Sequence, residues 1–147
     1  MNNRSFKSLI LVAFLALSSN PLLADESIVE QMNEYMSFQP YESGIMVPQQ
    51  IDKSVFETAL FVDTRDAEQY AKETIPGAIN IEWREVLERI DEVPETGKVI
   101  LFCNTGSLSS QATFALRVAG RANVVVLQTG LIGWKKDADF FSQRYGR

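Results

Sequence analysis

Short apolar runs alternate along the chain with stretches that have helical spacing. Three runs have the length and continuous apolar character of buried strands, at 59–63, 98–103 and 123–127. Such continuous runs indicate burial on both faces, as in a parallel sheet. Shorter runs at 45–47 and 79–81 predict two further strands.

The segments between these runs predict helices. We expect helices or helical turns at 27–38, 48–56, 66–72, 83–90, 110–118 and 135–141, with a turn at 130–134 before the last. Strands that alternate with helices through short connections are typical of an α/β fold. The pattern therefore predicts a parallel central sheet with helices on both faces.

The bulk composition suits one soluble domain. The chain has 147 residues, a length typical of a single domain, and 46% of them are hydrophobic. This is enough apolar material for a core of its own. We divide the chain into an acidic helical lead-in at 25–43 and the α/β domain at 44–147.

Residues 1–24 have the pattern of a secretory signal peptide. Two basic residues precede the apolar run 9–17, polar residues and a proline break that run, and Ala24 provides a small residue for cleavage. The run is shorter than the roughly 18–20 residues that a membrane-spanning helix needs. We expect cleavage after Ala24 and a periplasmic or otherwise exported protein. An uncleaved N-terminal anchor remains an alternative, because Leu22 is not the small residue that cleavage favours.

The charge balance argues against polyanionic partners. The formal net charge is -5, and loss of residues 1–24 would remove two of the 14 basic residues and none of the 19 acidic ones, leaving -7. No dense basic patch is evident. We therefore expect no nucleic-acid partner and no membrane contact after signal cleavage.

Histidine is absent and cysteine occurs once, at Cys103. Without an imidazole, Ser-His-Asp and Cys-His hydrolases are excluded, as are His-ligated metal sites. One cysteine cannot form an internal disulfide. We expect no metal and no cofactor, and an exported lone thiol draws attention to Cys103 itself.

Cys103 stands at the carboxyl end of the strongest predicted strand, where ligands bind in open α/β sheets. The small polar loop that follows can curl its N–H groups around the sulfur, and a helix N-terminus adds partial positive charge. Both favour a thiolate, or the outer sulfur of a persulfide. The candidate loop residues are Asn104, Thr105, Gly106, Ser107, Leu108 and Ser109. The alternative for Cys103 is an inert core residue.

The polar side chains around Cys103 have structural alternatives. The hydroxyls of Thr105, Ser107 and Ser109 could donate to the sulfur, or could make the turn and cap the helix. Asp63 and Arg65 follow another predicted strand and could reach the same loop. We favour a structural ion pair that braces the loops.

Three segments together resemble the rhodanese family. They are 61–65 (FVDTR, similar to a D-x-R element), 75–81 (IPGAINI, similar to I-P-G-A-x-N), and Cys103 with Gly106 followed by 130–134 (GLIGW, similar to G-x-x-G-W). The resemblance implies a five-stranded parallel sheet and a sulfurtransferase that forms a persulfide on Cys103. It implies a small sulfur-containing donor and a thiol or cyanide acceptor, with a protein as an alternative sulfur acceptor.

The chain departs from the family pattern at two positions. Leu108 stands where the loop often has Arg, and Thr74 stands where His is frequent. Thiosulfate is a dianion that such an Arg would help to hold, so its use as donor is in doubt. The departure leaves room for a binding module without turnover, or for a redox-sensing thiol. Phosphatase and arsenate reductase relatives are disfavoured, because no Arg lies between Cys103 and Arg117.

Overall fold

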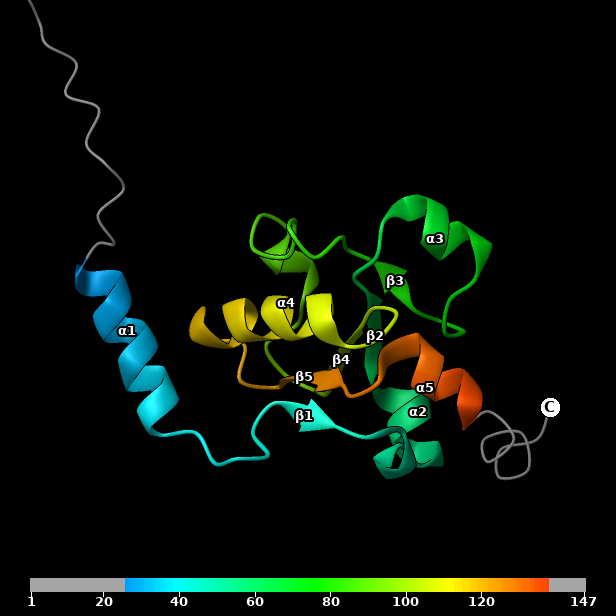
Figure 1. The fold of residues 1–147 in the computed structure, drawn as a ribbon, viewed down its shortest axis with the longest axis horizontal. Coiled ribbons are helices and arrows are strands. Elements are labelled where there is room, and N and C mark those ends of the chain that lie inside the picture. Colours follow the sequence, from blue (N-terminus) through cyan, green and yellow to red (C-terminus); the bar gives the residue numbers. More distant parts are fainter. Residues whose placement is uncertain (1–25, 138–147) are drawn as a thin grey trace, which may run out of the picture.

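The computed structural model describes residues 26–137, which form an α/β unit around one sheet (Figure 1). Its strands are β1 (Ile45–Met46), β2 (Leu60–Asp63), β3 (Ile79–Asn80), β4 (Val99–Phe102) and β5 (Val124–Leu127). All pairings are parallel, in the order β1-β5-β4-β2-β3. The predicted fold class is confirmed, and each predicted strand is present with slightly shorter bounds.

Helices cover both faces of this sheet. They are α1 (Glu26–Ser37), α2 (Lys53–Thr58), α3 (Ala67–Lys72), α4 (Ser107–Val118) and α5 (Gly130–Lys136), with 3-10 turns η1 (Pro48–Gln50) and η2 (Ile90–Glu92). In Figure 1, α4 lies on one side of the sheet and α2 and α5 lie on the other. No helix within residues 26–137 is long and apolar enough to cross a membrane.

Alternation along the strands builds two separate cores. Successive side chains of a strand point to opposite faces, so Phe61 joins the core beneath α2 and α5 whereas Val62 joins the core beneath α4. Ile100 and Leu101 divide in the same way, and every residue of β4 is buried. The continuous apolar run of β4 is therefore explained by burial on both faces.

The helix predicted at 83–90 is wrong. Residues 83–89 form successive turns that end in η2. The Trp83 amide donates to Thr64 O at 3.0 Å, and the Glu82 carboxylate accepts from the Arg84 amide at 2.9 Å. These bonds attach the start of the segment to the sheet and satisfy its amides locally, so a regular helical ladder does not form.

The helical segment predicted at 48–56 is divided into η1 and α2, which ends at Thr58, and the starts of two other helices also differ from the prediction. α4 begins at Ser107 and not at Ser110, because Gly106 turns directly into the helix at φ 97°. α5 begins at Gly130, where a turn was predicted, because Thr129 and Gly130 have φ values of 69° and 53°. The predicted continuation of this helix beyond residue 137, like the predicted signal peptide at 1–24, lies outside the described residues.

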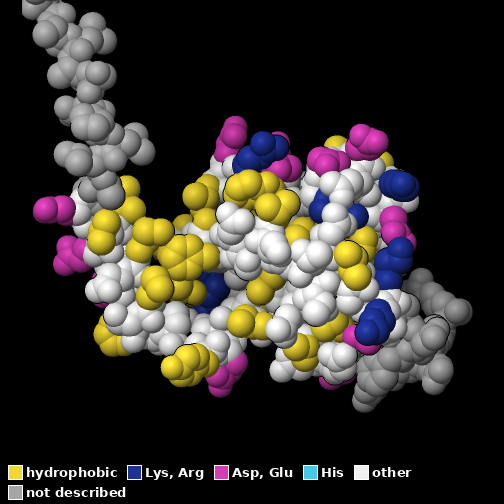
Figure 2. Space-filling view, viewed as in Figure 1, with side chains coloured by type: hydrophobic (Ala, Val, Ile, Leu, Met, Phe, Trp, Pro, Cys, Tyr) yellow, Lys and Arg dark blue, Asp and Glu magenta, His cyan; other side chains and the backbone are white. Residues whose placement is uncertain are grey.

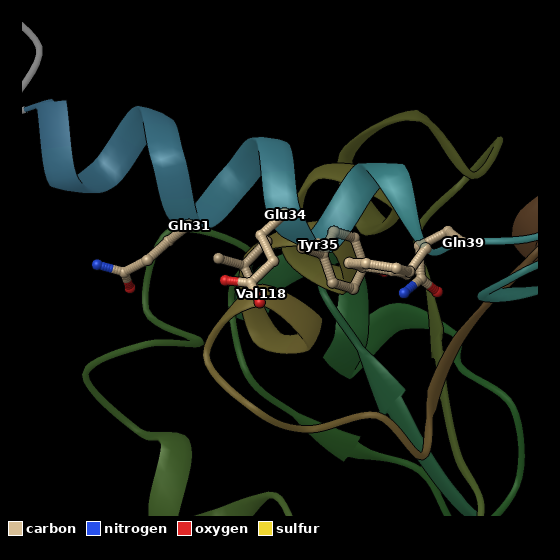
Figure 3. A pocket seen from close by; sticks show the side chains of 6 residues that line it. Gln31, Glu34, Tyr35, Gln39 and Val118 are labelled. Atoms are coloured by element: carbon tan, nitrogen blue, oxygen red, sulfur yellow. The ribbon is translucent and has the colours of Figure 1, made fainter.

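α1 contacts α4 through Tyr35, whose ring packs on Phe114 at 5.7 Å between ring centroids, and Arg117 of α4 bonds to Tyr35 and to the segment that follows α1. Arg117 donates from Nε to the Tyr35 hydroxyl at 2.7 Å, and from Nη2 to Gln39 Oε1 at 3.0 Å and Ser43 Oγ at 2.8 Å. α1 has no buried residue. Figure 3 shows the shallow pocket between these helices, with Tyr35 and Gln39 on one wall and Val118 on the other.

Candidate functional site

Cys103 is the first residue after β4, and its side chain is 3% exposed. Its Sγ atom accepts the Gly106 amide at 3.3 Å and the Ser109 hydroxyl at 3.5 Å. The Ser109 hydroxyl also lies 3.1 Å from Gly106 O, and its single proton can serve one acceptor at a time. The sulfur therefore lies among polar donors and is not enclosed by apolar side chains alone.

Gly106 makes the tight turn of this loop possible. Its φ of 97° falls in the region that favours glycine. A Cβ atom at this position would lie 3.4 Å from Leu127 O and 3.6 Å from Thr129 N. α4 starts at the next residue, so the amides of its first turn, which have no partner within the helix, are directed toward the Cys103 side chain.

The electrostatic surroundings of the thiol favour its anion. Burial raises the pKa of Cys103, whereas hydrogen bonds from the amide and hydroxyl of Ser109 and from the amides of Thr105 and Leu108 together lower it by more. The pKa therefore lies below its ordinary value of 9.0. Hydrogen bonds to the charged form and a helix N-terminus are known causes of such a shift.

The predicted loop residues divide into those that face the sulfur and those that do not. Of the three candidate hydroxyls, Ser109 contacts Sγ, whereas Thr105 and Ser107 contact each other, 3.1 Å apart, on the exposed side. Leu108 is 38% exposed in the first turn of α4. Gly106 occupies the N-cap position of α4, and no side chain caps this helix, so the capping alternative for the three hydroxyls does not apply.

Asn104 connects the loop to Arg65, which follows β2, and to the helix α3. Its Oδ1 accepts from Arg65 Nη1 at 3.2 Å, and its Nδ2 donates to Gln69 Oε1 at 2.8 Å. The Asn104 side chain therefore points away from the sulfur and holds the loop from outside. No sequence pattern indicates the Gln69 contact.

Asp63 and Arg65 form the buried ion pair that the sequence favoured. Arg65 donates to both Asp63 oxygens, at 2.9 Å from Nε and 2.5 Å from Nη2, and also to Glu73 O at 2.5 Å. Thr74 completes the pair through a 2.8 Å bond to Asp63 Oδ2. The hydrogen bond with Asp63 raises the pKa of Arg65, which stays protonated. The pair reaches the Cys103 loop only through Asn104.

The start of α5 contacts the loop directly, which the sequence analysis missed. The amides of Leu131 and Ile132 donate to Cys103 O at 2.8 Å and Asn104 O at 3.0 Å. A Cβ atom on Gly130 would lie 2.4 Å from Cys103 O, so only glycine fits there. The G-x-x-G-W pattern marked this segment, and Trp134 proves to be core, packed on Phe56 at 5.8 Å between ring centroids.

An apolar groove of about 300 Å³ lies beside the middle of α4. It runs between α4 and the turn segment that begins at Trp83, and includes Leu87, which is 51% exposed. Figure 2 shows hydrophobic side chains gathered above α4 where this segment lies. Within residues 26–137, no cluster of three or more metal-ligating side chains is present.

A family model and two related proteins agree on the family to which this chain is similar. The model of the rhodanese-like domain matches residues 47–137. A sulfurtransferase of Allochromatium vinosum is 31% identical over 80 residues, which cover 54% of this chain and 75% of that protein. The thiosulfate sulfurtransferase PspE of Escherichia coli K12 is 40% identical over 72 residues, 48% of this chain and 69% of that protein.

The fold comparison agrees. A rhodanese-related protein of Thermoplasma volcanium has a TM-score of 0.58 at 20% identity, covering 63% of this chain and 91% of that one. At this identity the similarity concerns the fold alone.

Proposed function

The chain belongs to the rhodanese-like family, and on that premise we propose that it is a sulfurtransferase or sulfur carrier that holds sulfur as a persulfide on Cys103. One observation carries the proposal: the only thiol lies where the Gly106 amide and the Ser109 hydroxyl reach its sulfur. These donors stabilise a thiolate, which is the nucleophilic form of cysteine.

The proposed reaction has two displacement steps. The Cys103 thiolate attacks the outer sulfur of a donor, a new S–S bond forms, and the donor's leaving group departs with the electron pair of the broken bond. A cyanide or thiol acceptor then attacks the outer persulfide sulfur and takes it, and the Cys103 thiolate is restored. Since one residue serves both steps, we expect double-displacement kinetics.

Two features of the chain narrow the proposed substrates. There is no second cysteine, so the acceptor must come from outside the chain. The loop offers no cation at Leu108, and Arg65 is already paired with Asp63. We therefore propose that polysulfides and persulfides are better donors than thiosulfate, and that protein thiols are one class of acceptor.

We also propose that the reaction takes place in an exported compartment. The support is the N-terminal sequence alone, with its basic start, its apolar run at 9–17 and the small Ala24. N-terminal sequencing of the secreted protein tests this: a chain that begins at residue 25 supports it, and a retained N-terminus in the cytosol contradicts it.

Intact-mass measurement after incubation with thiosulfate or polysulfide tests the function. We expect a one-sulfur adduct on the wild type that cyanide removes as thiocyanate, and no adduct on Cys103→Ser. Ser107→Ala, whose hydroxyl does not contact the sulfur, is the matched control and should behave as wild type. An adduct that persists in Cys103→Ser contradicts the assignment. Oxygen adducts instead of sulfur would favour a redox-sensing thiol.

A further inference from the structure

A short loop can adopt several backbone conformations, so some contact must fix the orientation of the loop amides around Cys103. The peptide group between Asn104 and Thr105 is planar and trans, so its carbonyl and its N–H point in opposite directions. Asn104 O accepts the Ile132 amide of α5 at 3.0 Å. With that carbonyl directed at α5, the N–H of Thr105 is directed away from α5, toward the sulfur.

The preceding peptide is held in the same way. Cys103 O accepts the Leu131 amide at 2.8 Å. Amides in the first turn of a helix have no partner within the helix, so both α5 donors are available for the loop. Two adjacent peptide groups of the Cys103 loop are thus fixed by consecutive residues of another strand-to-helix connection.

Gly130 allows α5 to come this close. Its position for a Cβ atom is 2.4 Å from Cys103 O and 2.8 Å from both Asn104 C and Asn104 O. Backbone atoms cannot move aside as a flexible side chain can. Any other residue at this position would force α5 and the loop apart, and the two hydrogen bonds would lengthen.

We propose that the first turn of α5 is a positioning element of the Cys103 site: Gly130 admits the amides of Leu131 and Ile132 to the carbonyls of Cys103 and Asn104, and this turns the Thr105 N–H toward the sulfur. The use of this arrangement in sulfur transfer rests on the function proposed above. The arrangement itself does not.

Ile132→Pro tests the proposal most directly. Proline removes the one N–H that binds Asn104 O, a first turn tolerates proline, and the Ile132 side chain is 60% exposed, so its loss costs little packing. The readout is the pH titration of thiolate ultraviolet absorbance, from which the same titration of a matched Cys103→Ser protein is subtracted because the four tyrosines also absorb when they ionise. The difference reports Cys103 alone, because no other cysteine exists. We expect the midpoint to rise by about 0.5–1 pH unit. Ile132→Ala keeps the N–H and should titrate as wild type.

Gly130→Ala tests the close approach. We expect a larger rise in the titration midpoint than for Ile132→Pro. The matched control is Gly120→Ala, which also has a positive φ (97°) but no atom within 4 Å of the added Cβ. A folded Ile132→Pro that titrates as wild type would overturn the proposal, as would a Gly120→Ala that shifts the midpoint as much as Gly130→Ala.

Two further outcomes keep the test decisive. Should neither variant fold while both controls do, amide hydrogen exchange of the wild type decides: protected amides at Leu131 and Ile132 support the proposal, and rapid exchange overturns it. The thiolate titration needs no sulfur transfer. A protein that transfers no sulfur, yet shows the predicted midpoint shifts, contradicts the function and leaves the positioning role of α5 intact.

Discussion

Leu108 is the residue at which the loop chemistry can be changed with least disturbance. Its side chain is 38% exposed, and only its amide contributes to the sulfur environment. We expect Leu108→Arg to lower the KM for thiosulfate about three- to tenfold, because an exposed cation can pair with the dianion. Initial-rate kinetics with cyanide as acceptor measure this.

Leu108→Gln separates charge from size. A neutral polar side chain of similar length should leave the KM for thiosulfate near the wild-type value, and turnover with polysulfide should change little in either variant. Equal improvement by Gln and Arg would show that the missing cation is not what limits thiosulfate use.

The Asp63–Arg65 ion pair contributes to stability, and single substitutions can test this. Asp63 is fully buried and Arg65 is 6% exposed, so removal of one partner leaves an uncompensated charge. We expect Arg65→Met to lower the free energy of unfolding by about 3–5 kcal/mol. The double variant Asp63→Asn, Arg65→Met should lose less than the sum of the two single variants. Urea unfolding of all four proteins measures the coupling energy between the two side chains. Losses of unfolding free energy that simply add would contradict the proposed ion-pair coupling.

At the scale of elements, α1 depends on Arg117. None of its residues is buried, and the arginine bonds to Tyr35 of α1 and to Gln39 and Ser43 in the segment that follows it. We expect Arg117→Met to release α1, so that amide hydrogen exchange of residues 26–43 rises severalfold while exchange of β4 is unchanged.

Arg121→Met is the matched control, because Arg121 lies near the same end of α4 but donates to Val93 O at 3.0 Å and pairs with Glu95. It should leave exchange in residues 26–43 as in wild type. Equal exchange in α1 for the two variants would show that Arg117 does not hold it.

The elements also show how far sequence patterns reach. The strand β4 and the helix α4 follow from local patterns, since a continuous apolar run and a series of good helix formers each need only their own residues. Residues 83–90 have a similar local pattern but form turns, because Trp83 bonds to Thr64 in another element. The α5 contact with Cys103 could not be predicted from the sequence either, since no local pattern shows which carbonyl will accept from the free amides at a helix start.

At the scale of the whole molecule, the Cys103 thiol links stability to pH. Its pKa in the folded protein lies below the ordinary value of 9.0, so between these values the unfolded chain binds more protons. The contribution of Cys103 to stability therefore rises with pH across this window and is lost as pH falls through the folded pKa.

Urea unfolding of the wild type and Cys103→Ser over a pH series tests this linkage. We expect the difference in unfolding free energy, wild type minus variant, to increase up to about pH 9. A difference that decreases over the same interval would place the folded pKa above the unfolded one, contrary to the hydrogen bonds at the sulfur.

The burial of the Cys103 side chain affects which other proteins can react with it. At 3% exposure, Cys103 presents little surface to a cysteine on another folded protein, so crosslinked dimers through its sulfur are disfavoured. A persulfide places its reactive outer atom about 2 Å farther out. Loading with sulfur would thus make the residue available to a second protein, and unloading would withdraw it again.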